Sequence, residues 1–341
     1  MKPLRNRRTG AIHLRRAGVV LLVAAFGATL AVPILLGGRV ALAAVVGFPV
    51  AGYLALLGVI ATSWLARAVK IRTLLHRLGV VAPFAQLLAI SLATDCAFMV
   101  TPAGVGGYAA SVYYLHRAGA SVSGATTITA ADQALDVIFF LLAVPLAAFT
   151  LFGAHLPSRW AIVAIGGGGL VLALVFAALF ARRRLLAWML GQDGAGARWP
   201  WWQRHRQALR GFCSNLVAHA RMLAAAGPWF FGAVFGLTAV QWLARYGVLW
   251  LALAVLGHPI SVAKAFLLQS IVLNAAQWTG MPAGGGGAEI GLTATLVAWV
   301  PATAIAAALL LWRMATLYAS LAAGLGAIGW LARRRDGQFR R

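Results

Sequence analysis

The sequence predicts an all-α polytopic membrane protein with about eight spans, including two re-entrant or broken hairpins in an inverted-topology repeat. Three observations predict this fold. Of the 341 residues, 62% are hydrophobic and 10% are charged, whereas a soluble domain is about 25% charged. Long apolar segments recur along the chain, and one Pro-Gly motif occurs twice. This composition excludes an ordinary cytosolic enzyme, a secreted disulfide scaffold and a disordered protein.

The candidate spans follow from the lengths of the apolar segments. A spanning helix needs about 20 mostly apolar residues because the hydrocarbon core is about 30 Å thick. Segments of this kind cover residues 17–36, 43–64, 81–100, 122–150, 160–181, 228–256, 262–280 and 302–331. The first is expected to be retained rather than cleaved as a signal, because no small-residue cleavage site precedes a polar stretch. We therefore treat residues 1–341 as a single integral membrane domain.

The basic residues predict the orientation of the chain. There are 29 Lys and Arg residues and 6 Asp and Glu residues, so the formal net charge is +23. Most basic residues lie before the first span, in residues 65–79, in the basic loop 182–227 and after the last span. Basic loops face the cytoplasm, so we expect both termini on the cytoplasmic side of a bacterial inner membrane. The apolar composition favours membrane lipids over nucleic acid as the partner.

Two basic segments have the spacing of amphipathic helices. They are residues 65–79 and residues 203–223 within the cytoplasmic basic loop. Helices of this kind lie along an anionic leaflet with their apolar side buried. The alternative is a solvated linker helix.

A repeated motif predicts an internal duplication, residues 81–150 and 262–331. Thr101-Pro-Ala-Gly-Val-Gly-Gly107 reappears as Met281-Pro-Ala-Gly-Gly-Gly-Gly287. The predicted orientation requires the two motifs to enter the membrane from opposite faces, which is the pattern of inverted-repeat transporters. Chance recurrence in a Gly-rich and Ala-rich chain is the alternative.

The prolines and glycines of the two motifs are candidate substrate-binding residues. Proline stops a helix and glycine leaves the backbone open, and the helix that follows directs its partly positive N-terminus at an anionic group. The alternative is that these glycines only permit close helix packing. The candidates are Pro102, Gly104, Gly106, Gly107, Pro282, Gly284, Gly286 and Gly287.

Four of the six acids fall inside the apolar region, where charge is costly and usually functional. Asp95, Asp132 and Asp136 are candidates for charge coupling, and Glu289 follows the second glycine run. Arg245 and Arg313 also lie within spans and are candidates to hold a lipid phosphate. The structural alternative pairs Asp136 with Arg313, or Glu289 with Arg245, as ion pairs. Gln269, Asn274 and Gln277 are further candidates for polar lining.

These residues resemble the lysylphosphatidylglycerol synthase transmembrane-region family, also called flippase-like integral membrane proteins. The resemblance lies in Pro102–Gly107, Asp132–Asp136, Pro282–Glu289 and the Trp312-Arg313 pair, and it covers nearly the whole chain. It implies a stand-alone member without the soluble aminoacyl-transferase domain. Lipid translocation between leaflets is therefore implied, rather than lysyl transfer.

Two departures from the family pattern concern the first half of the chain. Gln133 stands where the family usually has Arg, and Tyr108-Ala109 stands where members often carry an acid. The charge pattern of the first repeat is therefore weaker than in the family.

The leading function is a flippase for an anionic or aminoacylated phospholipid, a polyprenyl lipid or a hopanoid-type lipid. One alternative is a scaffold for a lipid-biosynthesis enzyme, docked through the basic loop 182–227. A less favoured alternative is a lipid-modifying enzyme, since the chain has no His-Glu-x-x-His or Gly-x-Ser-x-Gly motif. Cys96 and Cys213 have no metal-ligand spacing. We predict no catalytic residue, metal or cofactor, and the sequence does not predict an oligomeric state.

Overall fold

In the computed structural model, residues 4–153, 200–277 and 279–338 are described, and they form helices and turns without a strand. The predicted span 160–181 and residues 182–199 of the basic loop lie outside these ranges. The first half of the described chain contains α1 (Leu4–Val46), α2 (Val50–Arg77), α3 (Phe84–Val100), η1 (Pro102–Gly104), α4 (Val105–Arg117) and α5 (Val122–Phe152). The second half contains α7 (Pro200–Ala224), α8 (Pro228–Val255), α9 (Val262–Gln277), η4 (Pro282–Gly284), α10 (Gly287–Leu296), α11 (Ala302–Arg313), η5 (Met314–Ala319) and α12 (Ser320–Gln338).

Five described helices are long and apolar enough to cross a membrane. They are Gly18–Val46, Val50–Arg77, Val122–Phe152, Pro228–Val255 and Ala302–Arg334. The all-helical membrane class is therefore confirmed. Two segments expected to span, 81–100 and 262–280, form the shorter helices α3 and α9, of 17 and 16 residues.

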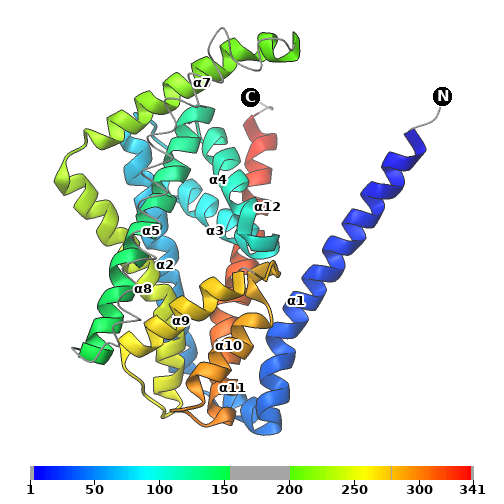
Figure 1. The fold of residues 1–341 in the computed structure, drawn as a ribbon, viewed down its shortest axis with the longest axis vertical. Coiled ribbons are helices and arrows are strands. Elements are labelled where there is room, and N and C mark those ends of the chain that lie inside the picture. The colour runs from blue at the N-terminus through cyan, green and yellow to red at the C-terminus, as the bar shows by residue number, and fades with distance from the viewer. Residues whose placement is uncertain (1–3, 154–199, 278, 339–341) are drawn as a thin grey trace.

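α2 corrects one prediction. Residues 65–77 are not a separate helix lying along a leaflet, because they continue the second span as one helix of 28 residues. The reason is that two of their bases have partners in the interior. Arg67 is 5% exposed and Lys70 is 0% exposed. The segment 203–223 does form a separate helix, α7, which packs against α5 and crosses one end of the bundle (Figure 1).

The two Pro-Gly motifs are the turns of two short helical hairpins. α3 packs against α4, and α9 packs against α10. The first hairpin fills the half of the molecule nearer α7, and the second fills the opposite half (Figure 1). Their tips, η1 and η4, contact each other. The fold thus brings together two segments that are far apart in the sequence.

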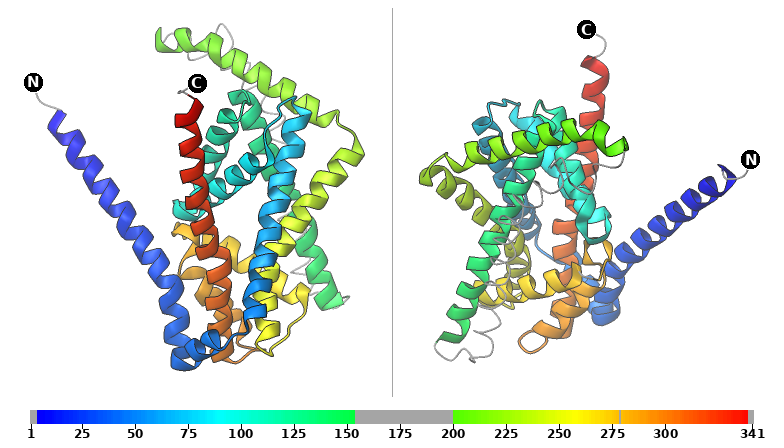
Figure 2. Two further views of the ribbon diagram at one scale, coloured as in Figure 1. Left: turned by 180° about the vertical axis from the view of Figure 1, so that it is seen from behind. Right: turned by 45° about the horizontal axis from the view of Figure 1, so that its top comes forward.

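α1 and the C-terminal helices complete the arrangement. The second half of α1 packs along α11 and contacts η4, whereas its first half leans away from the bundle (Figures 1 and 2). α11 continues through the π-helical turn η5 into α12, which packs against α3. Arg313 is the last residue before this π turn, and such turns often occur at functional sites.

Candidate functional site

A six-charge cluster links four helices in the interior. Its members are Arg67 and Lys70 of α2, Asp95 of α3, Asp132 and Asp136 of α5, and Arg245 of α8. The Arg67 guanidinium pairs with Asp95 and lies 3.2 Å from Asp132. The Lys70 ammonium lies 2.6 Å from Asp132 and 3.2 Å from Asp136. Arg245 lies 3.1 Å from Asp95. Three cations therefore neutralise three carboxylates.

Helix periodicity explains how this cluster forms. Residues three or four apart lie on one face of a helix. This spacing presents Arg67 and Lys70 together on α2, and Asp132 and Asp136 together on α5. Isolated charges in a low-dielectric interior cost several kcal/mol, so each member depends on its partners. The most accessible members are Arg245 and Asp136, whose side chains are 19% and 13% exposed.

The apolar segments predict the three aspartates inside the protein, but they do not predict Arg67 and Lys70 as their partners. Both were assigned to the cytoplasmic surface because they belong to a basic amphipathic pattern. An available signal was the excess of buried acids, since four intramembrane carboxylates need more cations than Arg245 and Arg313 supply. The alternative pairing was also wrong. Asp136 pairs with Lys70, and Arg245 pairs with Asp95.

A second buried pair, Glu289 and Arg313, joins α10 to the end of α11. Glu289 is fully buried, and one of its oxygens pairs with the Arg313 Nε. Its other oxygen accepts a hydrogen bond from the Gly286 N–H, at 2.8 Å. Arg313 Nη1 donates to the Ala283 carbonyl, at 3.2 Å. The pair therefore binds the backbone of the second hairpin tip on both sides of Gly284.

This geometry changes the expectation for the N-terminus of α10. The glycine-rich motif predicts an anionic ligand at that helix end, but the Glu289 carboxylate already caps it. An acid in the first turn is stabilised by the helix dipole. One Arg313 nitrogen, Nη2, is buried and has no hydrogen-bond partner among the described residues. That nitrogen, rather than the helix end, is the unpaired donor at this pair.

The two hairpin tips adopt the same backbone conformation. Ala103 has φ 50° and ψ 16°, and Ala283 has φ 52° and ψ 18°. Within the described ranges, they are the non-glycine residues with positive φ. The glycine after each alanine is also left-handed, with φ 72° at Gly104 and 63° at Gly284. The two motifs therefore form the same turn, and the duplication itself stays a prediction.

Several candidate glycines have a packing role, which was the alternative interpretation. A Cβ at Gly106 would overlap Thr101, and a Cβ at Gly107 would overlap the Phe98 ring. Gly285, which was not a candidate, touches the α1 backbone at Ala25 so closely that a side chain has no space. Of the two prolines, Pro102 is exposed and Pro282 is buried.

The first hairpin lacks the charge pair of the second. Ala109 and Gln133 occupy the repeat positions of Glu289 and Arg313, so both partners differ together. The charges near the first hairpin come instead from α2, α5 and α8. The weaker charge pattern expected for the first half is therefore compensated by cations from another part of the fold.

The remaining polar candidates mostly bind backbone. Gln269 donates to the carbonyls of Tyr246 and Ala265, and Asn274 donates to that of Ser270. Gln277 is exposed at the end of α9. In the part of the chain that the structure describes, no three His, Cys, Asp or Glu side chains are grouped to hold a metal ion.

Comparison with known proteins gives one family. A family model described as "Lysylphosphatidylglycerol synthase TM region" matches residues 14–324. No curated protein matches the chain. The matched region includes both hairpins, the six-charge cluster and the Glu289–Arg313 pair.

Proposed function

The chain belongs to the lysylphosphatidylglycerol synthase TM region family, membrane proteins of lipid metabolism, and we propose that this member moves a lipid headgroup between the two leaflets. The observation that carries the proposal is the contact between η1 and η4, with buried charges on α2, α5 and α11 and the partly buried Arg245 of α8 around the hairpins. Irregular backbone is tolerated inside a membrane only where protein or a polar cavity surrounds it. We propose transport without covalent change to the lipid.

The proposed topology has about eight spans and two hairpins that enter from opposite faces as an inverted repeat. Helix lengths support it. α3 has 17 residues and α9 has 16, so each is about 25 Å long and falls short of a 30 Å core. The start of α1, the helix α7 and the end of α12 lie at one end of the molecule (Figure 1). We propose that this end is cytoplasmic, in a bacterial inner membrane.

The more exposed members of the six-charge cluster are proposed to meet the headgroup. A lipid phosphate replaces Asp95 as the partner of Arg245, and an ammonium on an aminoacylated lipid replaces Lys70 as the partner of Asp136. This exchange keeps every charge paired, so it avoids the cost of a bare buried ion. Lys70 and Arg67 retain Asp132 throughout.

Transport into proteoliposomes tests the proposal. Phosphatidylglycerol, lysylphosphatidylglycerol and a polyprenyl phosphate, each with a fluorescent headgroup, are offered on one side, and protection from a membrane-impermeant quencher is followed over time. We expect transport of at least one lipid and a slower rate for Arg245→Ala. The matched control is Arg72→Ala, which removes an exposed base of α2.

The Glu289–Arg313 pair needs a balanced variant, because Arg313→Ala alone leaves a buried carboxylate unpaired. The double variant Glu289→Gln, Arg313→Gln removes both charges. We expect it to remain folded and to lose transport. Absence of transport for every lipid class by the unaltered protein would reject the function.

The scaffold alternative is favoured by one observation, the exposed basic side of α7. Arg210 and Arg221 are exposed on a helix that otherwise packs on α5. A scaffold would lose its cellular effect in Arg210→Gln, Arg221→Gln but keep it in the Glu289–Arg313 double variant. A flippase would show the reverse.

A further inference from the structure

Asp136 is the carboxylate of the six-charge cluster with the weakest support from cations. Asp95 and Asp132 each pair with two basic side chains. The ion pair described for Asp136 is with Lys70 alone, at 3.2 Å, and the same ammonium lies closer to Asp132, at 2.6 Å. The Asp136 side chain is 13% exposed, against 7% for Asp95 and 4% for Asp132. Asp136 is therefore the least neutralised and the most accessible of the three carboxylates.

The surroundings of Asp136 add a like charge from its own helix. Asp132 lies one turn earlier on α5, so the two carboxylates share a face and repel each other. On α2, Arg67 stands beyond Lys70 and is held by Asp95, and Trp242 of α8 lies beside the Asp136 carboxyl group. Other titratable or charged side chains on the elements packed against α5 have contacts of their own: Arg117 of α4 at Tyr113, His116 of α4 at Ala120, His219 of α7 at Ser123, Arg245 of α8 at Asp95, Tyr246 of α8 at Phe266 and Lys264 of α9 at Trp299. Asp136 therefore depends on one shared ammonium.

The charge balance of the cluster distinguishes two kinds of lipid. At rest, three cations face three carboxylates. An aminoacylated lipid brings an ammonium together with its phosphate, so the exchanges proposed above keep every charge paired. An anionic lipid such as phosphatidylglycerol brings its phosphate alone, and four anions then face three cations. An unpaired buried carboxylate is costly and becomes neutral by taking up a proton.

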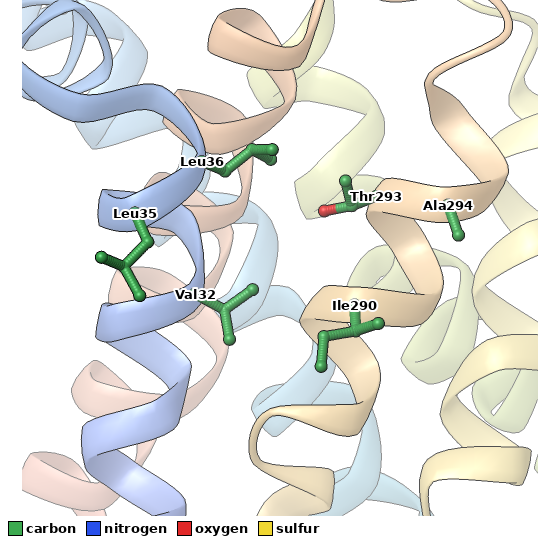
Figure 3. Close-up of a pocket in the computed structure, with 6 residues that line it drawn as sticks. All are labelled: Val32, Leu35, Leu36, Ile290, Thr293 and Ala294. Atoms are coloured by element: carbon green, nitrogen blue, oxygen red, sulfur yellow. The ribbon is translucent and has the colours of Figure 1, made fainter.

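The second hairpin does not supply the missing cation near its tip. Arg313 is already paired with Glu289. The groove between α1 and α10 is apolar, and none of its six described lining residues is charged: Val32, Leu35, Leu36, Ile290, Thr293 and Ala294 (Figure 3). The excess negative charge must therefore be met within the six-charge cluster itself.

We propose that Asp136 takes up one proton while the six-charge cluster holds an anionic headgroup, so that a proton accompanies each anionic lipid. The inference rests on the proposed lipid transport and names its coupling ion. The proton passes from water to a carboxylate oxygen of Asp136, and Lys70 then pairs with Asp132 alone. When the headgroup leaves, the proton returns to water and the Lys70–Asp136 pair forms again. An aminoacylated lipid needs no proton, because its ammonium neutralises Asp136.

Transport of two lipids at different pH values tests this coupling. Phosphatidylglycerol and lysylphosphatidylglycerol, each fluorescent in one acyl chain so that the headgroup is unaltered, are compared in proteoliposomes between about pH 5 and pH 8. Transport of phosphatidylglycerol should fall as the pH rises, approaching about tenfold per pH unit, because the protonated fraction of Asp136 falls by that factor. Transport of lysylphosphatidylglycerol should change little, since its ε-ammonium stays charged in this range. An imposed pH gradient should drive only phosphatidylglycerol, toward the alkaline side.

Variants at Asp136 make the result specific. Asp136→Asn fixes the neutral form, so transport of phosphatidylglycerol should continue without pH dependence, whereas lysylphosphatidylglycerol should no longer be transported. Asp136→Glu should keep the pH dependence. The matched control is Asp336→Asn, in the basic C-terminal segment, which should behave like the unaltered protein. The same pH dependence for both lipids, or for Asp136→Asn and the unaltered protein, would overturn the inference.

Infrared difference spectroscopy tests the proton site without measuring transport. The full-length protein in a maltoside detergent receives ether-linked phosphatidylglycerol, which has no ester carbonyl to obscure the signal. We expect the C=O band of a protonated carboxyl group to appear in the unaltered protein and in Asp336→Asn, but not in Asp136→Asn. Absence of the band from the unaltered protein would overturn the inference and leave the flippase function standing. A band that depends on Asp136, without transport of any lipid, would keep the proton site and reject the flippase function.

Discussion

Lys70 is the residue on which the six-charge cluster depends most. It has no exposed surface, and its ammonium lies between Asp132 and Asp136. Asp132 also pairs with Arg67, whereas the ion pairs described for Asp136 involve Lys70 alone. Removing the ammonium therefore leaves one buried carboxylate without a cation and another with a weaker set of partners.

Lys70→Met is expected to lower the free energy of unfolding by about 3 kcal/mol, because breaking a buried pair leaves an uncompensated charge. Thermal unfolding in detergent measures the change. Adding Asp136→Asn should recover part of the loss. Arg72→Met, at an exposed position of the same helix, should have little effect. Equal melting temperatures for Lys70→Met and Arg72→Met would show that the ammonium is not buried in this cluster.

Ala283 shows a different cost at the residue scale, because it holds a left-handed conformation without being glycine. Ala283→Gly should leave the stability unchanged or raise it by up to about 1 kcal/mol, since the Cβ clash is relieved. Ala288→Gly, in the regular helix α10, should lower it by about 1 kcal/mol. Unfolding of the two variants in parallel gives the comparison. A similar loss in both would contradict the strained turn.

At the scale of elements, the fold depends on short broken helices that pack against long ones. α3 stops at Val100, just before Pro102, because proline cannot continue the hydrogen-bond ladder. α9 stops at Gln277, before the left-handed Gly280. The turn of the second hairpin then rests on α1 at Gly285. α1 leans away from the bundle over its first half (Figure 2). α1 therefore packs against the rest of the protein through α11, α10 and the second hairpin tip.

Gly285→Ala tests the contact between the second hairpin tip and α1. Gly285 has φ −55° and ψ 130°, which alanine adopts easily, so any effect comes from the overlap of its methyl group with the Ala25 backbone. We expect a loss of about 1–3 kcal/mol, as for other overpacked sites. The measurement is unfolding in detergent. Gly236→Ala, in α8 with open space around the Cα, should be neutral or stabilising. An unchanged stability for Gly285→Ala would mean that α1 does not pack against the hairpin tip at this position.

At the scale of the whole molecule, the proposed inverted arrangement makes a prediction about sidedness. In that arrangement, the loop after α4 and the loop after α10 belong to hairpins that enter from opposite faces. In a protein with Cys96→Ser and Cys213→Ser, Arg117→Cys should react with a membrane-impermeant thiol reagent from the cytoplasmic side, and Ala298→Cys from the other side. Both positions are exposed. Labelling of both from one side would refute the inverted repeat and remove the main support for transport.

The sequence predicted a large part of this molecule for identifiable reasons. Apolar composition and segment length were sufficient for the helical membrane class, and the Pro-Gly motifs located both hairpin tips. The family resemblance is confirmed by the match over residues 14–324. Asp95, Asp132, Asp136 and Glu289 were placed in the interior because each acid stands within an apolar segment. These properties are local, so they can be read without knowing which helices touch.

Tertiary structure alone decided which charges meet. Arg67 and Lys70 follow an amphipathic pattern that also suits a membrane surface, and only the approach of α2 to α3 and α5 buries them. Glu289 could have paired with Arg245, but the hairpin brings it to Arg313. Ion pairs form over a few ångströms, whereas these residues are 24 or more positions apart in the chain. Their pairing therefore depends on how the helices pack, and the sequence pattern contains no direct record of it.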